Sequence, residues 1–160
     1  YHIPAVHPAL NRELDYRAYV TELGKRHVLQ YAPVQAGTAS LYRDGAGDGS
    51  AYYFWLHPNV MLNIYEGLLQ TNVVIPDGVD RCTVRFDWFA IDPKPDQAKD
   101  AHFLKLLEFS VLVQEEDRVI CETVQQNLGS RAARPGRYSP LRETGPHLFH
   151  RLITEGSDPS

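Results

Sequence analysis

Residues 51–91 read AYYFWLHPNVMLNIYEGLLQTNVVIPDGVDRCTVRFDWFAI, and this segment predicts most of the architecture. Successive side chains of a strand point to opposite faces of a sheet. The segment begins with that alternation, because Tyr53 and Trp55 take the face opposite to Phe54. Four apolar runs follow one another, at residues 51–58, 59–67, 68–76 and 81–91. Short turn sequences at Pro58-Asn59 and in PDGVD, residues 76–80, join them, which predicts an antiparallel meander.

Helices are expected after this sheet. Pro93 and Pro95 end the last strand, and a helical pattern begins near Gln97 and ends near Gly129 or Ser130. Apolar residues recur along it at intervals of three and four, which predicts one buried stripe. The stripe comprises Leu106, Phe109, Ser110, Val113, Asp117, Ile120, Cys121, Val124 and Leu128. A last helix is predicted at HLFHRLITEG, residues 147–156.

Shorter elements are expected before the sheet. Residues 9–27 carry apolar positions at helical spacing and predict one or two short helices, with Gly24 as the stop. Residues 27–34 alternate as a strand, and residues 37–50, rich in Gly and Asp, predict a loop. The class is therefore α+β, an antiparallel sheet with a long helix. A chain of 160 residues, 43% of them hydrophobic, fits a single domain, residues 1–160.

Charge and cysteine content narrow the function classes. The net charge is −4 with scattered Lys and Arg, so we expect no nucleic-acid partner and no membrane partner. No run reaches the length of a membrane span. Cys82 and Cys121 both lie in apolar patterns, which predicts buried, reduced thiols in a cytoplasmic protein. The sequence opens inside a motif without an initiator Met, so we expect a longer protein with parts upstream.

The first eight residues, YHIPAVHP, suggest a metal site. His2 and His7 are five residues apart, and on a regular helix their side chains would diverge by about 140°. Pro4 and Pro8 interrupt that regularity, so we expect a bent turn that directs both imidazoles at a small divalent metal. The alternative from spacing alone is a pair of solvated surface histidines.

Asp117 is the carboxylate that this site lacks. It falls inside the predicted buried stripe, whereas Glu115 and Glu116 point away from it at the same helical pitch and are expected to be solvated. A buried carboxylate needs a partner, either a metal or an arginine such as Arg85 or Arg131. With His2 and His7, Asp117 would complete the two-histidine, one-carboxylate set typical of non-haem Fe(II) oxygen chemistry.

Two further features keep alternatives open. His147 and His150 lie three residues apart on the last predicted helix, so they are either a second metal pair or part of a packed amphipathic end. The sheet is also rich in aromatic residues, which are either ordinary core or the wall of a pocket for an aromatic ring or a quaternary ammonium group. These are Tyr52, Tyr53, Phe54, Trp55, Tyr65, Phe86, Trp88 and Phe89.

Several motifs together resemble the C-terminal catalytic domain of the large (alpha) subunit of Rieske non-haem iron oxygenases. YHIPAVHP resembles that family's Y-H-x4-H-P iron motif, and FWLHPNVMLN its F-P-N-x-M-x-N strand. EEDRVICETVQQNLGS resembles the E-D-x3-C-E-x-V-Q helix, and GRYSPLRETGPHLFHRLI the closing segment. The likeness spans almost the whole chain and is strongest to the group that contains choline monooxygenase and aromatic-ring-hydroxylating relatives.

The resemblance implies a fold and a set of partners. The fold would be the helix-grip, START-like arrangement, in which an antiparallel sheet wraps a long helix. By position, His2, His7 and Asp117 would be the catalytic iron ligands. Fe(II) would use O2 to hydroxylate a small organic substrate, aromatic or quaternary ammonium, by mono- or dioxygenation. Electrons would come from a reductase or ferredoxin through a two-iron two-sulfur Rieske cluster in an upstream domain, commonly of a neighbouring subunit in a trimer.

Two other functions remain possible from sequence. The chain could be a non-catalytic small-molecule-binding module of the same fold, or a zinc hydrolase that uses the same three ligands. Its two cysteines lack the paired Cys and His spacing that holds a Rieske cluster. We therefore expect residues 1–160 alone to be inactive without the rest of the protein.

Overall fold

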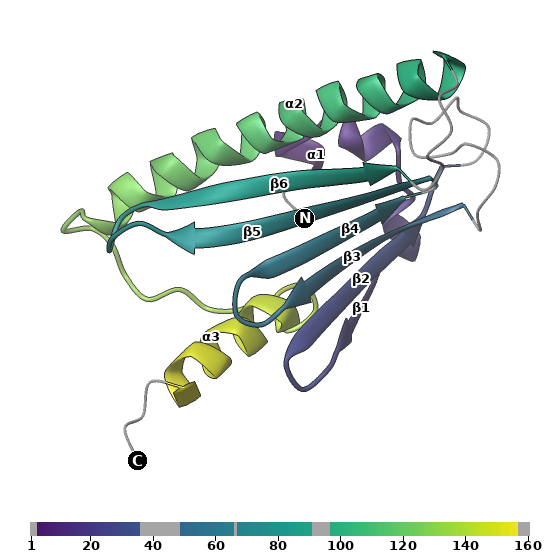
Figure 1. Ribbon diagram of the computed structural model, residues 1–160. Helices are drawn as coiled ribbons and strands as arrows, with labels where there is room; N and C mark the ends of the chain where they lie inside the picture. Colours follow the sequence, from purple (N-terminus) through teal and green to yellow (C-terminus); the bar gives the residue numbers. More distant parts are fainter. Residues whose placement is uncertain (1–2, 36–48, 66, 91–96, 157–160) are drawn as a thin grey trace.

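The computed structural model describes residues 3–35, 49–65, 67–90 and 97–156 (Figure 1). Short elements come first, then strands, then two longer helices. In chain order they are α1 Ile3–Val6, the 3-10 turns η1 Leu10–Arg12 and η2 Tyr16–Ala18, β1 Val20–Leu23, β2 His27–Pro33, β3 Ser50–Leu56, β4 Val60–Tyr65, β5 Leu68–Pro76, β6 Cys82–Ala90, α2 Gln97–Leu128 and α3 Thr144–Gly156. The expected loop at 37–50 falls almost wholly outside the described residues.

The sheet is an antiparallel meander, as predicted from residues 51–91. Within the described residues it has six strands in the order β1-β2-β3-β4-β5-β6, each paired with its neighbour in sequence. The register places Tyr53 opposite Asn63, Asn63 opposite Gln70, and Gln70 opposite Trp88. These side chains therefore share one face, since directly opposed residues of neighbouring strands point the same way.

Both long helices contact that same face. The amide Nε2 of Gln70 in β5 donates to the hydroxyl of Ser110 in α2 over 2.8 Å. The ring of Trp55 in β3 lies edge-on to Phe149 of α3, with centroids 5.3 Å apart. Figure 1 shows α2 running along β5 and β6, and α3 beside the β2–β4 end of the sheet. Both α2 and α3 therefore lie on the same side of the sheet.

The core forms where the N-terminal turns meet the sheet and α2. Its buried members are Leu10, Leu14, Ala32, Val34, Ala51, Tyr65, Leu68 and Leu106. Leu14 is 1% exposed, and its backbone forms an isolated antiparallel bridge with Val34 beyond the end of β2. Packing at this junction fixes the segment that follows α1 against the sheet.

The predicted helices over residues 9–27 are wrong in their second half. Leu10–Arg12 and Tyr16–Ala18 are single 3-10 turns, and Val20–Leu23 is strand β1. Val20 pairs with Tyr31 and Leu23 with Val28 in β2. The available edge of β2 supplies these backbone hydrogen bonds, and it outweighs a helical pattern in a segment that contains β-branched residues.

The buried stripe predicted along the long helix is correct only for its first part. Leu106 is buried and Phe109 and Val113 pack on the core, but Ile120, Val124 and Leu128 are exposed. A helix of 32 residues is about 48 Å long, whereas a nine-residue strand spans about 30 Å. The second half of α2 is less fully covered than its start, although β5 and β6 run beside it (Figure 1).

The predicted burial of the two cysteines needs correction. Cys82 and Cys121 are free as predicted, but both are exposed instead of buried. Cys121 lies in the second half of α2 and Cys82 is the first residue of β6. None of the helices in the residues described combines the length and apolarity that a bilayer span needs.

Candidate metal centre

His7 directly follows α1. The backbone N–H of His7 donates to the carbonyl of Ile3 over 2.8 Å, and that of Asn11 donates to the carbonyl of His7 over 2.9 Å. The segment is therefore one helical turn followed by η1, and the predicted interruption at Pro4 is absent. Pro4 is tolerated because it lies in the first turn, where a backbone N–H has no intrahelical acceptor.

The imidazole of His7 contacts two carboxylates of α2. Its Nδ1 lies 2.7 Å from Oε2 of Glu116, and its Nε2 lies 2.9 Å from Oδ1 of Asp117. The residue is 2% exposed. A carboxylate only accepts hydrogen bonds, so a neutral ring donates to one of them and turns a lone pair toward the other. The lone pair and the carboxylate that it faces repel each other. A cation bound between them would remove this repulsion.

The carboxylates differ from the sequence prediction. Asp117 was expected to be buried, but its side chain is 43% exposed. Glu116 was expected to be solvated, yet its side chain is 25% exposed and binds His7. A helical wheel assumes one continuous buried stripe, whereas α1 lies beside this part of α2 (Figure 1) and the His7 ring that follows it contacts both Glu116 and Asp117. Glu115 is exposed as expected.

The geometry fits a metal in part. Two ligands at right angles on one ion, each about 2 Å from it, lie about 3 Å apart. The 2.9 Å between Nε2 of His7 and Oδ1 of Asp117 matches this separation. The described part of the chain contains no group of three His, Cys, Asp or Glu side chains placed to hold a metal. His2, the predicted third ligand, lies outside the described residues, so the three-ligand set stays a prediction.

Within the described residues, neither Arg85 nor Arg131 forms the predicted ion pair with Asp117. The guanidinium Nε of Arg85 pairs with Asp87 on the same strand, at 3.1 Å. On α2, Arg118 pairs with both Glu115 and Glu122. The hydrogen bond from Arg118 lowers the pKa of the Glu115 carboxyl. These cations therefore pair with other exposed acids, whereas Glu116 and Asp117 pair with His7 among the described residues.

The pKa of the Cys121 thiol is raised in this part of α2. It lies one turn after Asp117, and partial burial is the main cause that raises its pKa. The Asp117 carboxylate and Cys82 raise it further, because a nearby negative charge disfavours a thiolate. This thiol is therefore a poor nucleophile and a poor metal ligand.

The second histidine pair, His147 and His150, is not buried. Among the described residues it forms no group with a third side chain that could hold a metal. His147 and His150 are exposed and both of their rings contact Tyr138, which fits the amphipathic helix end and not a second metal pair. The Tyr138 hydroxyl hydrogen-bonds Nδ1 of His150, and the Tyr138 ring lies edge-on to His147. In α3 the buried side is provided by Gly145 and Leu148.

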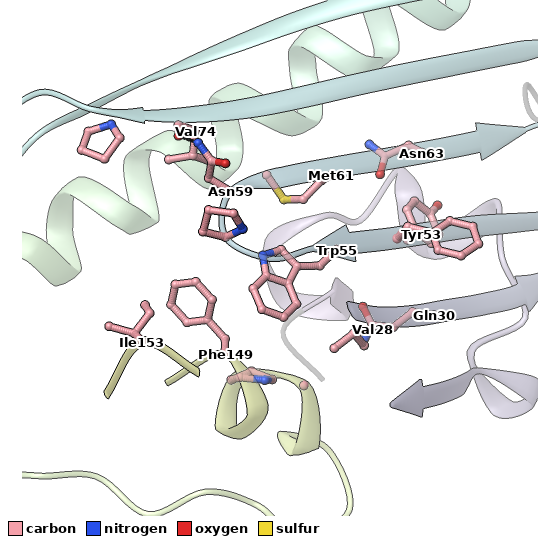
Figure 2. A pocket seen from close by; sticks show the side chains of 15 residues that line it. Val28, Gln30, Tyr53, Trp55, Asn59, Met61, Asn63, Val74, Phe149 and Ile153 are labelled. Carbon is pink, nitrogen blue, oxygen red and sulfur yellow. Dashed lines mark hydrogen bonds between the residues drawn. The ribbon is translucent and has the colours of Figure 1, made fainter. Parts of the chain in front are cut away.

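A cavity of about 680 Å³ lies between the sheet and α3 (Figure 2). Figure 2 shows Phe149 beside Trp55 at this cavity, with Met61 and Asn63 of β4 along one wall. His7, Glu116 and Asp117 are not among the described lining residues, and the link between the cavity and the N-terminal segment is Tyr53, which also packs on the core cluster around Leu10. None of the described lining residues is charged. The cavity therefore suits a small, largely apolar molecule.

Of the predicted aromatic wall, only part lines this space. Tyr53, Phe54 and Trp55 border the cavity. Tyr65 and Trp88 instead pack in or on the core, and Phe89 is 51% exposed. Tyr65 and Trp88 are therefore core residues, whereas Tyr53, Phe54 and Trp55 form part of the pocket wall.

Residues 1–156 match the family described as the catalytic domain of the ring hydroxylating alpha subunit. The chain belongs to this family, as its motifs predicted.

Plant enzymes are among its curated relatives. The chain is 38% identical over 158 residues to the chloroplastic choline monooxygenase of Arabidopsis thaliana, which covers 96% of the chain and 35% of the relative. It is 33% identical over 157 residues to the chloroplastic choline monooxygenase of Beta vulgaris, which covers 97% of the chain and 34% of the relative. The chain thus spans about a third of the length of these relatives.

Solved structures share the fold. A quaternary ammonium Rieske monooxygenase, described in relation to carnitine oxidation and inter-subunit electron transfer, superposes with a TM-score of 0.84 at 21% identity, over 99% of this chain and 44% of that one. A complex of such an enzyme with L-carnitine gives 0.78 at 20% identity, over 99% and 42%. At these identities the likeness establishes the fold, and it confirms the antiparallel sheet with its long helix.

Proposed function

We propose that this chain is the catalytic iron domain of a Rieske-type monooxygenase that hydroxylates a quaternary ammonium compound. The observation that carries the proposal is the His7 ring, buried at the start of the chain with Nε2 2.9 Å from Asp117 on α2. Membership of the ring-hydroxylating family supports it. His7 and Asp117 would hold the metal, and His2 would complete the set by position in the family motif.

Fe(II), when bound, supplies the redox chemistry that activates O2. The chain's own residues supply position and environment. His7 is held by contacts on both ring nitrogens, which fixes the orientation of its plane. The cavity beside β3, β4 and α3 would hold the substrate and displace water from it.

The cavity fits a quaternary ammonium substrate that is held by aromatic rings and not by acidic side chains. Tyr53, Trp55 and Phe149 supply aromatic rings, and the lining described carries no acidic side chain. Ring faces attract a dispersed cation with about 0.5–2 kcal/mol each. The names of the choline monooxygenase relatives support the same choice over an aromatic ring.

The remaining partners belong to the same proposal. Electrons would come from a reductase or ferredoxin through a two-iron two-sulfur Rieske cluster outside this chain, and the protein would form a trimer. A cytoplasmic location remains our prediction from the two free cysteines, although the plant relatives are named as chloroplastic.

The test uses the full-length protein, loaded anaerobically with Fe(II) and supplied with a reductase and NADH. Choline-like and carnitine-like compounds, and arenes as the contrast, are each incubated under labelled O2. We expect one labelled oxygen atom in an ammonium product, and loss of product in Asp117→Asn. Turnover of arenes alone would reject the substrate class. Binding without turnover would favour a non-catalytic module, and hydrolysis with zinc a zinc enzyme.

A further inference from the structure

We propose that Glu116 is a positioning residue, which orients His7 for metal binding through the ring nitrogen that does not face Asp117. This inference rests on the proposed iron site. It assigns separate roles to the two adjacent carboxylates of α2: Asp117 would contact the metal, and Glu116 would act through His7.

The contacts separate the two roles. Oε2 of Glu116 lies 2.7 Å from Nδ1 of His7, and Oδ1 of Asp117 lies 2.9 Å from Nε2. Consecutive helical residues diverge by about 100°, so neighbouring side chains of one helix can reach the two sides of one ring. The ring is therefore held at both nitrogens by a single rigid element, α2.

Glu116 would act by fixing which ring nitrogen of His7 carries the proton. A carboxylate at Nδ1 accepts the N–H there, which leaves the lone pair of a neutral imidazole on Nε2. That nitrogen faces Asp117, the other candidate ligand. Histidines that bind metals commonly donate their other N–H to a carboxylate, which fixes the tautomer and strengthens the ligand.

The acids around Glu116 show that its contact is specific. Glu115, its neighbour, is 57% exposed and pairs with Arg118, which also pairs with Glu122. Glu116 is 25% exposed and pairs with the buried His7. Glu115 therefore offers a matched control: the same residue type, one position away, without a contact to His7.

The experiment compares the full-length wild type with Glu116→Ala, Glu116→Gln, Asp117→Asn and the control Glu115→Gln. Anaerobic competition against a chromophoric chelator measures the affinity for Fe(II). The electron paramagnetic resonance spectrum of the nitric oxide adduct reports the symmetry of the mononuclear site separately from a Rieske cluster. Near-ultraviolet circular dichroism checks that each variant is folded.

We expect Glu116→Ala to weaken Fe(II) binding by about 10–100-fold and to alter the nitrosyl spectrum. Glu116→Gln should restore most of the affinity, because its amide oxygen accepts the same hydrogen bond. Glu115→Gln should match the wild type, and Asp117→Asn should lose most binding. A purely structural role would not alter the nitrosyl spectrum of the folded variant.

Three outcomes would overturn the assignment. Wild-type affinity and spectrum in Glu116→Ala would show that the contact has no role. Loss of iron in Glu116→Gln with retention in Asp117→Asn would make Glu116 the ligand itself. Absence of iron binding by the wild type would reject the proposed function as well, which distinguishes that failure from the first two.

Discussion

Nε2 of His7 lies 2.9 Å from Oδ1 of Asp117, although 110 positions separate the two residues. The contact joins the segment after α1 to the second half of α2. His7 is almost fully buried, whereas the side chain of Asp117 is 43% exposed. The histidine of the pair is therefore buried, and solvent reaches the pair from the side of the aspartate.

Metal binding should tie α1 to α2 and stabilise the full-length protein. A ligand that binds only the folded state at 100 times its Kd contributes about 2.7 kcal/mol. We expect anaerobic Fe(II) to raise the midpoint of thermal unfolding of the metal-free wild type and of Glu115→Gln, but not of Asp117→Asn. Calorimetry measures it, and an equal rise in Asp117→Asn would contradict the ligand role.

Gln70 links the sheet to α2 through a buried amide. It is 1% exposed, accepts from Asn63 over 3.0 Å and donates to Ser110 over 2.8 Å. Ser110→Ala removes the acceptor, and an unsatisfied buried donor costs about 1–3 kcal/mol. We expect faster hydrogen exchange of the α2 amides around residues 106–113, measured by mass spectrometry.

The control for this prediction is Thr123→Ala on the same helix. The Thr123 hydroxyl is exposed and donates to the carbonyl of Val119, so its removal should change stability by less than about 0.5 kcal/mol. Equal exchange in Ser110→Ala and Thr123→Ala would show that the Gln70 contact contributes nothing.

Trp55 should discriminate a cation from an uncharged group of the same shape. We expect Trp55→Leu to weaken binding of choline by about 2–30-fold, the equivalent of one cation–π contact, and Trp55→Phe to weaken it less. The uncharged carbon analogue 3,3-dimethylbutanol should lose little in either variant. Competition assays on the full-length protein measure both affinities, and equal losses for the two ligands would exclude a cation–π role.

High pH should destabilise the region around Tyr19. Burial, and to a smaller extent Tyr65, raises the pKa of Tyr19 to about 12. Because this folded value exceeds the unfolded value of about 10, the stabilisation is present below about pH 10 and is lost as the pH rises toward 12. By about pH 11 the wild type should lose on the order of 1 kcal/mol more than Tyr19→Phe.

Urea unfolding of the wild type and Tyr19→Phe across this range measures the difference. Tyr16 stacks on Tyr19 with centroids 5.7 Å apart, and burial also raises its pKa. Tyr16→Phe should therefore reduce the alkaline loss in the same direction. Parallel pH profiles for all three proteins would contradict the prediction.

The sheet and the long helix were predictable because they depend on local patterns. Alternation over residues 51–91 specifies which side chains share a face, and turn residues at Pro58 and in residues 76–80 specify antiparallel neighbours. Strand β1 was missed because its backbone partners are the free edge of β2. That edge exists only once β2 and β3 have paired.

The sequence alone also determined the candidate ligands, since the H-x4-H motif and the acid within an apolar helix pattern can both be read from residue order. Tertiary structure decided which atoms meet and how exposed they are. It brought Glu116 to Nδ1 of His7 and left Asp117 half-exposed, against the helical-wheel expectation. The physical reason is that periodicity orients side chains about the axis of one helix, whereas burial and partners depend on what packs along that helix and where its cover ends.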